Sequence, residues 1–398
     1  MKLCFISKYL PIEGGVSSST YWLARGLGEI GNKIYVVTNA WEVEDEYREE
    51  ISKKEMKLFE PKNVKVFSTS SRPPYHIPYS TSYVAKLTSL AIDIVRRFNP
   101  NLLFAFYMLP YGVSGYFTKL ITKKPLVFKH AGSDITRLFN YPFFTTLFSE
   151  VFTNADKILT SPFKQKQLMN IGVSPNRMEY IHDAINLKYF DPKVKPFKFS
   201  EIEDDDPIFT YLGKTSRLKK TVNFLKAATK LKKEHFHVCM IVEKGRASEE
   251  LKILTKKLGI ENKVIFLPFQ PPWRIPSIMV ASTAIVSPES EETPYLPAGT
   301  HYPKIIREAM ACGKCTIIGE GVSKKGVYSQ LRDGLHTFIV DPNNLNHFAQ
   351  KMKMIIKDPD KAYEMGKEAR RISEKNENWR EYLKMNAKIF QDIIDNQG

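Results

Sequence analysis

Short apolar segments alternate with amphipathic, helix-like segments along this chain, and the alternation occurs in two successive series. The first series begins with an apolar run at residues 3–6, a helix-like stretch at 16–30 and a second apolar run at 33–38. A crossover between parallel strands usually contains a helix of this kind, so the pattern is typical of a parallel sheet covered by helices. It therefore predicts an α/β fold with doubly wound, Rossmann-like sheets.

The alternation continues to residue 181, stops at a charged, proline-flanked segment (191–207), and starts again at residue 208. The chain has 398 residues, more than the about 250–300 at which a single core usually stops growing. We therefore expect two Rossmann-like domains, 1–195 and 205–375, and a terminal segment, 376–398, with an amphipathic helix at 377–394. The other expected strands are 64–67, 102–106, 126–129, 157–160, 178–181, 208–212, 238–242, 264–267, 284–287 and 316–318, and the helices of the second series are 221–231, 249–257, 276–280 and 304–311.

The formal net charge is +16, and much of it is concentrated in residues 51–129. This region has 13 basic and 3 acidic side chains, interleaved with aromatic residues. A solvated basic face is the simplest interpretation, and the sharper one is contact with an anionic membrane surface or a lipid-phosphate acceptor. Nucleic acid is not expected as a partner, because no recognition-helix pattern or nucleic-acid motif accompanies the charge.

Four cysteines in a chain of this length do not make the disulfide framework of a small secreted protein. Cys312 and Cys315 form a single C-x-x-C pair, whereas zinc would need further ligands at fixed spacing, so no metal is expected. There is no apolar run of about 20 residues and no signal-peptide layout. A cytoplasmic location is therefore expected, with peripheral attachment to the cytoplasmic face of the membrane as a further hypothesis.

Glycines that follow a strand are candidates for contacts with an anion. Gly14 and Gly15 follow the first expected strand and precede a helix, where free backbone N–H groups can approach a phosphate; a tight turn is the alternative. The G-x-G-x-x-G match at residues 26–31 ends a helix and precedes a strand, which is the wrong order for a dinucleotide-binding turn. NAD is therefore not expected as a cofactor.

Cations and carboxylates gather at strand ends in the second half of the chain. Gly213 ends a strand, and basic side chains from Lys214 to Lys219 precede the next helix, a combination suited to a diphosphate. Acidic residues follow the strand at 284–287, and Glu308 lies on a helix pattern. A carboxylate can accept two hydroxyl hydrogen bonds, so these groups suit a ribose or a sugar. Ordinary surface charge is the alternative for both sets.

Taken together, these motifs resemble the family 4, group 1 glycosyltransferases, whose two-Rossmann architecture is called GT-B. The resemblance covers almost the whole chain, and Glu308 opens its most specific signature, residues 308–313. It also rests on residues 11–16, 23–27, 31–33 and 129–134, on Gly213 and Lys214 with Lys219, on 332–334 and 357–359, and on Asn378-Trp379. In this family the helix that begins at the last of these motifs crosses back to the N-terminal domain, and we expect 376–398 to do so here.

The resemblance implies that a sugar is moved from a nucleotide-sugar donor, with UDP- and GDP-sugars expected first, to a glycan, lipid-linked or small-molecule acceptor with retained anomeric configuration. The N-terminal domain would hold the acceptor and the C-terminal domain the donor. The implied catalytic residues are His130, Lys214, Lys219 and Glu292, and the implied donor-binding residues are Gly14, Gly15, Gly213, Arg217, Thr300, Lys304, Ile305 and Glu308. The lysines would neutralise the diphosphate leaving group, where fixed cations stabilise the transition state most, so neither metal nor cofactor is expected.

The sequence departs from the family pattern at the first of two glutamates that are usually eight residues apart. Thr300 stands eight residues before Glu308, and Glu292 stands sixteen before it. Either an insertion separates Glu292 from its partner, or Thr300 and backbone amides near 301–304 contact the sugar. Lys220 stands where the family usually has a glycine after the clamp lysine.

Two other functions remain open from the sequence. One is a nucleotide-sugar 2-epimerase-like enzyme on the same fold, since a fold does not fix its chemistry, and it would alter the sugar without an acceptor. The other is a basic protein that binds nucleic acid or a membrane, and it would show steeply salt-dependent binding to polyanions with no affinity for a nucleotide sugar.

Overall fold

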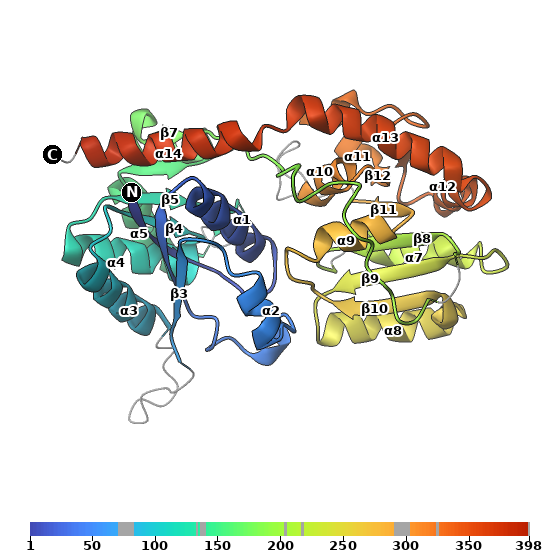
Figure 1. The fold of residues 1–398 in the computed structure, drawn as a ribbon, viewed down its shortest axis with the longest axis horizontal. Helices are drawn as coiled ribbons and strands as arrows, with labels where there is room; N and C mark the ends of the chain where they lie inside the picture. The colour runs from blue at the N-terminus through green and yellow to red at the C-terminus, as the bar shows by residue number, and fades with distance from the viewer. Residues whose placement is uncertain are drawn as a thin grey trace. The chain divides into compact units, whose positions relative to one another are not determined.

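The computed structural model describes residues 1–70, 83–132, 134–135, 141–202, 205–215, 219–289, 303–323 and 326–396. The chain forms two compact units (Figure 1). Unit 1 comprises Met1–Asp183 and Arg380–Gly398, and unit 2 comprises Ala184–Trp379. In the part of the chain described, no helix has the length and apolar character needed to cross a membrane.

Unit 1 contains a parallel sheet whose strand order is β3-β2-β1-β4-β5-β6-β7. The expected α/β class is therefore confirmed for this half, and the central strands β1 and β4 are buried apart from Lys2, as their apolar sequences predict. The strands are β1 (Lys2–Ser7), β2 (Lys33–Thr38), β3 (Val64–Ser68), β4 (Leu102–Phe106), β5 (Leu126–Lys129), β6 (Lys157–Leu159) and β7 (Met178–Glu179). The helices are α1 (Gly15–Glu29), α2 (Lys53–Leu58), α3 (Tyr83–Phe98), α4 (Val113–Thr122), α5 (Pro142–Asn154), α6 (Pro162–Met169) and α14 (Trp379–Asp395).

Both faces of the first sheet are covered by helices. Alternate residues such as Cys4 and Ile6 join a core with side chains of α3, α4 and α5. Phe5 alternates with Cys4 and Ile6 along β1, so its side chain points to the opposite face of the sheet. There Phe104 packs against Phe5, with ring centroids 4.7 Å apart, and against Phe390 of α14, with ring centroids 5.7 Å apart. The last helix therefore supplies part of the core of the unit in which the chain begins.

Unit 2 contains a second parallel sheet, with strand order β10-β9-β8-β11-β12-β13. The strands are β8 (Ile208–Leu212), β9 (His237–Val242), β10 (Val264–Pro268), β11 (Ala284–Ser287), β12 (Cys315–Gly319) and β13 (Phe338–Val340). The helices are α7 (Thr221–Thr229), α8 (Arg246–Leu258), α9 (Ile275–Ala281), α10 (Lys304–Ala311), α11 (Glu320–Ser323), α12 (Leu345–Lys357) and α13 (Pro359–Asn376). A π-turn at Met108–Gly112 in unit 1 and 3-10 turns at Asp45–Tyr47, Pro175–Arg177, Glu261–Lys263 and Gly326–Gln330 complete the described elements.

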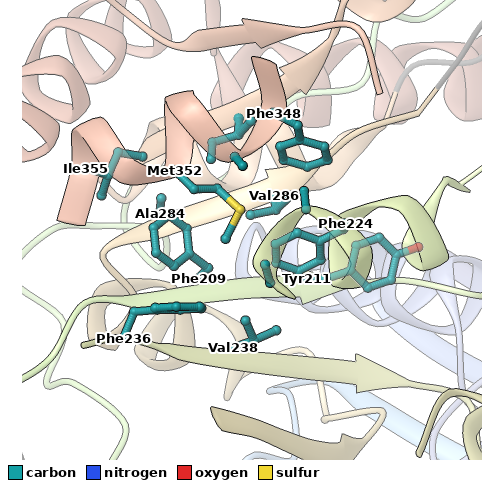
Figure 2. Packing of buried hydrophobic residues seen from close by; sticks show 14 of the residues in the cluster. Phe209, Tyr211, Phe224, Phe236, Val238, Ala284, Val286, Phe348, Met352 and Ile355 are labelled. Atoms are coloured by element: carbon teal, nitrogen blue, oxygen red, sulfur yellow. The ribbon is translucent and has the colours of Figure 1, made fainter. Parts of the chain in front are cut away.

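The core of unit 2 lies between β8, β11 and the helices α7 and α12. Figure 2 shows Met352 of α12 directed toward Phe209 of β8, with Phe224 of α7 beside Tyr211. Phe224 and Phe348 stack with ring centroids 5.8 Å apart. This packing fixes the strand ends and the N-terminus of α7, which carry the candidate site.

Candidate functional site

The candidate site in unit 2 lies where the direction of strand addition reverses. From β8 the chain adds β9 and β10 on one side, and it then returns to add β11, β12 and β13 on the other side. In open α/β sheets, ligands bind beyond the carboxyl ends of the strands at such a switch point. The residues that follow β8 and β11 are therefore the first place to look for a binding site.

The loop after β8 is held by two strand-end groups. Gly213 has φ 153°, and a Cβ there would lie 3.1 Å from the Tyr211 hydroxyl, so the position suits glycine. The Tyr211 hydroxyl donates to the Lys214 carbonyl oxygen at 2.8 Å. Thr215 donates from its backbone N–H and its hydroxyl to the carboxylate of Glu243, which follows β9, at 2.8–3.0 Å. The Lys214 side chain is exposed on this ordered loop.

Lys219 forms an ion pair with Glu289, so it bridges the ends of β8 and β11 across the switch point. The Glu289 side chain is 8 % exposed and that of Lys219 is 21 % exposed. The Ser287 hydroxyl also donates to Glu289, at 3.4 Å. Burial raises the pKa of Tyr211 well above its usual value, and the nearby carboxylates of Glu289 and Glu243 raise it further.

The helix α10 carries the other candidate donor contacts in unit 2. Its first turn contains Lys304 and Ile305, both half-buried, and it is fixed by the Tyr328 hydroxyl, which donates to the Pro303 carbonyl oxygen at 2.7 Å. Glu308 is buried one turn later. The structure thus places the carboxylate expected to bind ribose on a firmly packed helix of unit 2.

Arg307, the neighbour of Glu308, forms a buried two-point ion pair with Glu377 at 2.6 and 2.7 Å. The Glu377 carboxylate also accepts the backbone N–H of Ile185 at 2.7 Å. Ile185 lies where the chain enters unit 2, and Glu377 lies where it leaves. We call these three residues the crossover clamp, because they fasten both ends of unit 2 to α10.

Gly14 and Gly15 in unit 1 begin α1 directly after the loop that follows β1. Gly14 has φ 108°, which favours glycine, and it is the N-cap of the helix. Among the described residues, an added Cβ at either glycine would meet no atom within 4 Å. The space next to the Cα atoms of this helix start is therefore open, which leaves room for a ligand beside the helix N-terminus.

His130 follows β5 and is buried, with both ring nitrogens bonded to protein groups. Gly132 N–H donates to Nδ1 at 3.0 Å, so Nδ1 is an acceptor and the ring proton of the neutral form lies on Nε2, 2.7 Å from the Thr160 hydroxyl. Burial lowers the pKa of His130 to about 3, and Lys164 and Lys129 lower it as well. At neutral pH the imidazole is uncharged and orders this loop.

Asp134 holds the same loop from the other side. Its carboxylate accepts backbone N–H bonds from Ala131, Ile135 and Met108 at 3.1–3.2 Å, and Met108 belongs to the π-turn after β4. Burial raises the pKa of Asp134 to about 6, although these bonds favour the ionised form. Asp134 therefore joins the loops that follow β4 and β5.

The structure places the predicted site residues in two groups. Gly14, Gly15 and His130 belong to unit 1, and Gly213, Lys214, Lys219, Lys304, Ile305 and Glu308 belong to unit 2. Arg217, Glu292 and Thr300 lie outside the described residues. The roles assigned to all of these residues remain predictions.

Two residues at these strand ends, Thr160 and Glu243, were not singled out from the sequence. Each is the first residue after a strand, the position from which a polar side chain reaches the edge of a parallel sheet. Asp134 belongs to the motif at 129–134 and Glu289 to the acidic stretch that follows residues 284–287, and only their partners were not expected. Among the described residues, no cluster of His, Cys, Asp and Glu could hold a metal ion, and Cys312 and Cys315 are buried free thiols.

Comparison with known proteins identifies both halves of the chain. Residues 13–189 match the family described as Glycosyltransferase Family 4, and residues 193–372 match Glycosyl transferases group 1. The chain is 21% identical over 376 residues to an N-acetyl-alpha-D-glucosaminyl L-malate synthase of Bacillus anthracis, which covers 93% of this chain and 92% of that protein. It is 23% identical over 242 residues to a D-inositol 3-phosphate glycosyltransferase of Rhodococcus jostii, covering 58% of this chain and 51% of that protein.

Solved structures share the fold over nearly the full length. HepE of Anabaena, in complex with UDP and glucose, aligns with a TM-score of 0.68 at 16% identity, covering 98% of this chain and 99% of that chain. Sucrose-phosphate synthase from Thermosynechococcus elongatus aligns with a TM-score of 0.69 at 16% identity, covering 99% of each chain. The two parallel sheets, the two family matches and these structures show that the chain belongs to the family 4, group 1 glycosyltransferases of the GT-B type.

Proposed function

We propose that this glycosyltransferase uses a nucleotide-sugar donor, with UDP- and GDP-sugars first among the candidates, and that it retains the anomeric configuration. The observation that carries the proposal is Lys219 at the switch point of the second sheet, beside the ordered loop Gly213–Thr215 and the start of α7. Cations and helix N–H groups that converge at such a point suit a diphosphate. The structures of HepE with UDP and with UDP-glucose support testing uridine donors first.

In the proposed reaction the acceptor hydroxyl oxygen bonds to the anomeric carbon and loses its proton, while the bond between the sugar and the diphosphate breaks. The nucleoside diphosphate leaves with the negative charge that develops on its phosphate. Lys214 and Lys219 would stabilise that charge, so the reaction would need no resident metal. Glu308 would accept hydrogen bonds from the ribose hydroxyls. His130 would contribute as a neutral, positioned group, since its nitrogens are already bonded to Gly132 and Thr160.

A thermal-shift panel of UDP-, GDP-, ADP- and dTDP-sugars tests the donor site. At 100 times its Kd, a ligand adds about 2.7 kcal/mol to the free energy of unfolding. For a unit of this size that corresponds to a Tm increase of about 5 °C or more. The increase should persist in EDTA and should be lost in Glu308→Gln but kept in Glu320→Gln, whose side chain is exposed at the start of α11.

Two results would contradict this assignment. One is the absence of a Tm increase with every nucleotide sugar. The other is an equal increase in Glu308→Gln and Glu320→Gln. An altered sugar released without any acceptor would instead indicate an epimerase-like reaction.

We propose that the acceptor is anionic or lipid-linked and approaches the basic region of unit 1. L-Malate and inositol 3-phosphate, which appear in the names of two relatives, are small anions. In favour of a lipid surface, α4 exposes Phe117, Leu120 and Ile121, whose spacing places them on one helix face, and Lys123 follows the helix.

Vesicle flotation distinguishes these acceptor classes. If α4 contacts lipid, the protein should float with vesicles that contain anionic lipid and not with neutral vesicles. Leu120→Ser should then weaken vesicle binding about tenfold, because one large apolar side chain no longer enters the interface. Tyr363→Ser, at an exposed apolar position of unit 2, is the control that should bind as the original protein does. Equal recovery with both kinds of vesicle would favour a small anionic acceptor.

A further inference from the structure

The lysine proposed to bind the donor diphosphate already has a buried anionic partner. Lys219 pairs with Glu289, whose carboxylate is almost completely removed from solvent and also receives the Ser287 hydroxyl. The backbone at Glu289 is fixed by close approach to β12, because a Cβ at Gly319 would lie 2.1 Å from the Glu289 carbonyl oxygen. The main chain that carries this carboxylate is therefore held in place at the sheet edge.

A second carboxylate increases the negative charge at this edge. Glu243 follows β9 and receives two donors from Thr215, and both Glu243 and Glu289 act on the pKa of Tyr211, which lies between them. A site for a dianionic phosphate would be expected to exclude carboxylates, since like charges in a partly buried site repel strongly. The presence of Glu289 on Lys219 therefore requires a reason.

We propose that Glu289 is a displaceable counter-ion of Lys219: the donor diphosphate replaces it on binding, and it returns to Lys219 when the nucleoside diphosphate product leaves. Without a ligand, Glu289 compensates the charge of Lys219. When the diphosphate binds, the same carboxylate repels it and limits its affinity. This inference rests on the proposed function, because it assumes that Lys219 contacts the diphosphate.

The consequence for the reaction concerns the product more than the donor. The nucleoside diphosphate carries one more negative charge than the phosphate groups of the donor sugar, so a carboxylate that competes for Lys219 disfavours the product more strongly. A competing internal anion therefore promotes release of the product, a step that limits turnover in many enzymes. Glu289 would thus lower the affinity for the nucleoside diphosphate and so speed its dissociation after the transfer.

The test compares binding of UDP and GDP to the full chain by calorimetry in the original protein, in Glu289→Gln and in Glu243→Gln. Glu289→Gln should bind the nucleoside diphosphate about tenfold or more tightly, because the repulsion is removed while a side chain of the same shape remains. Uridine and guanosine, which lack phosphate, should bind both proteins equally. Glu243→Gln should show a smaller gain, because this carboxylate is bonded to Thr215 and does not compete with the diphosphate for Lys219.

The direction of the change separates this role from a structural one. A carboxylate needed only for folding would, when replaced, weaken binding of every ligand, nucleosides included. If the original protein binds UDP or GDP and Glu289→Gln binds it no more tightly, the counter-ion role is wrong while the proposed function stands. If no form of the protein binds either nucleotide, the proposed donor site fails and this inference fails with it.

Discussion

Turnover should fall about 10²–10³-fold when Lys219 is replaced by methionine, because a fixed cation no longer stabilises the charge that develops on the leaving diphosphate. Methionine retains most of the length of the lysine side chain, so the packing around α7 is largely preserved. The loss should appear mainly in kcat, since the interaction strengthens as the bond to the sugar breaks. The measurement is steady-state kinetics with the nucleotide sugar that gives the largest thermal shift.

The matched control is Lys226→Met, which removes one positive charge from the exposed side of α7, the helix that follows Lys219. The two variants have the same net charge. Lys226→Met should nevertheless change kcat by less than about twofold relative to the original protein, because solvent screens a surface charge that does not contact the diphosphate. Equal kinetic losses in the two variants would show that Lys219 acts only through the overall charge of unit 2.

Glu377→Ala should lower the free energy of unfolding by about 3–5 kcal/mol, because it leaves the guanidinium of Arg307 buried without its counter-ion. It also removes the acceptor of the Ile185 N–H, so both points at which unit 2 joins the rest of the chain lose their attachment to α10. For about 200 residues the corresponding decrease in Tm is about 10 °C, which thermal unfolding followed by circular dichroism would measure.

Two comparisons make this result specific to the crossover clamp. Glu250→Ala breaks an exposed ion pair with Arg246 in the same unit and should change the stability by less than about 0.5 kcal/mol. Arg307→Met combined with Glu377→Gln should recover part of the loss, since it removes the unpaired charge and keeps an acceptor for Ile185. A Tm that is equal in Glu377→Ala and Glu250→Ala would contradict the prediction.

The fold could be predicted from the sequence wherever a strand is a continuous buried apolar run. The structure confirms the expected bounds of β2, β4, β5, β8 and β11, whose sequences are mostly apolar. Two elements were not predicted from the sequence: β13, which has only three residues, and α13, whose buried stripe includes small residues such as Ala362, Gly366 and Ala369. A Cβ at Gly366 would lie 2.1 Å from the Gly313 carbonyl oxygen, so this helix packs by close backbone approach, which gives a weak hydrophobic signal.

The sequence indicates which residues lie at strand ends near the candidate site, but not which of them pair with one another. The position of Lys219 beside a strand end follows from the local pattern, whereas its pairing with Glu289 depends on β8 and β11 being neighbours in the sheet. Sequence periodicity contains no information on that order. In the same way, His130 was placed correctly after a buried strand, but its neutral state depends on Gly132 and Thr160, and the latter comes from another strand end.

The position of α14 has a consequence for how the protein is made. Unit 2 is one continuous segment, and all of it has been synthesised once residue 379 is added. Unit 1, which the ribosome starts first, still lacks the helix whose Phe390 packs on Phe104. Domains usually fold in the order in which they are synthesised. Here part of one face of the unit 1 sheet stays uncovered until the second unit has been synthesised, because α14 comes after it. The unit that is first to begin folding is therefore the last to finish.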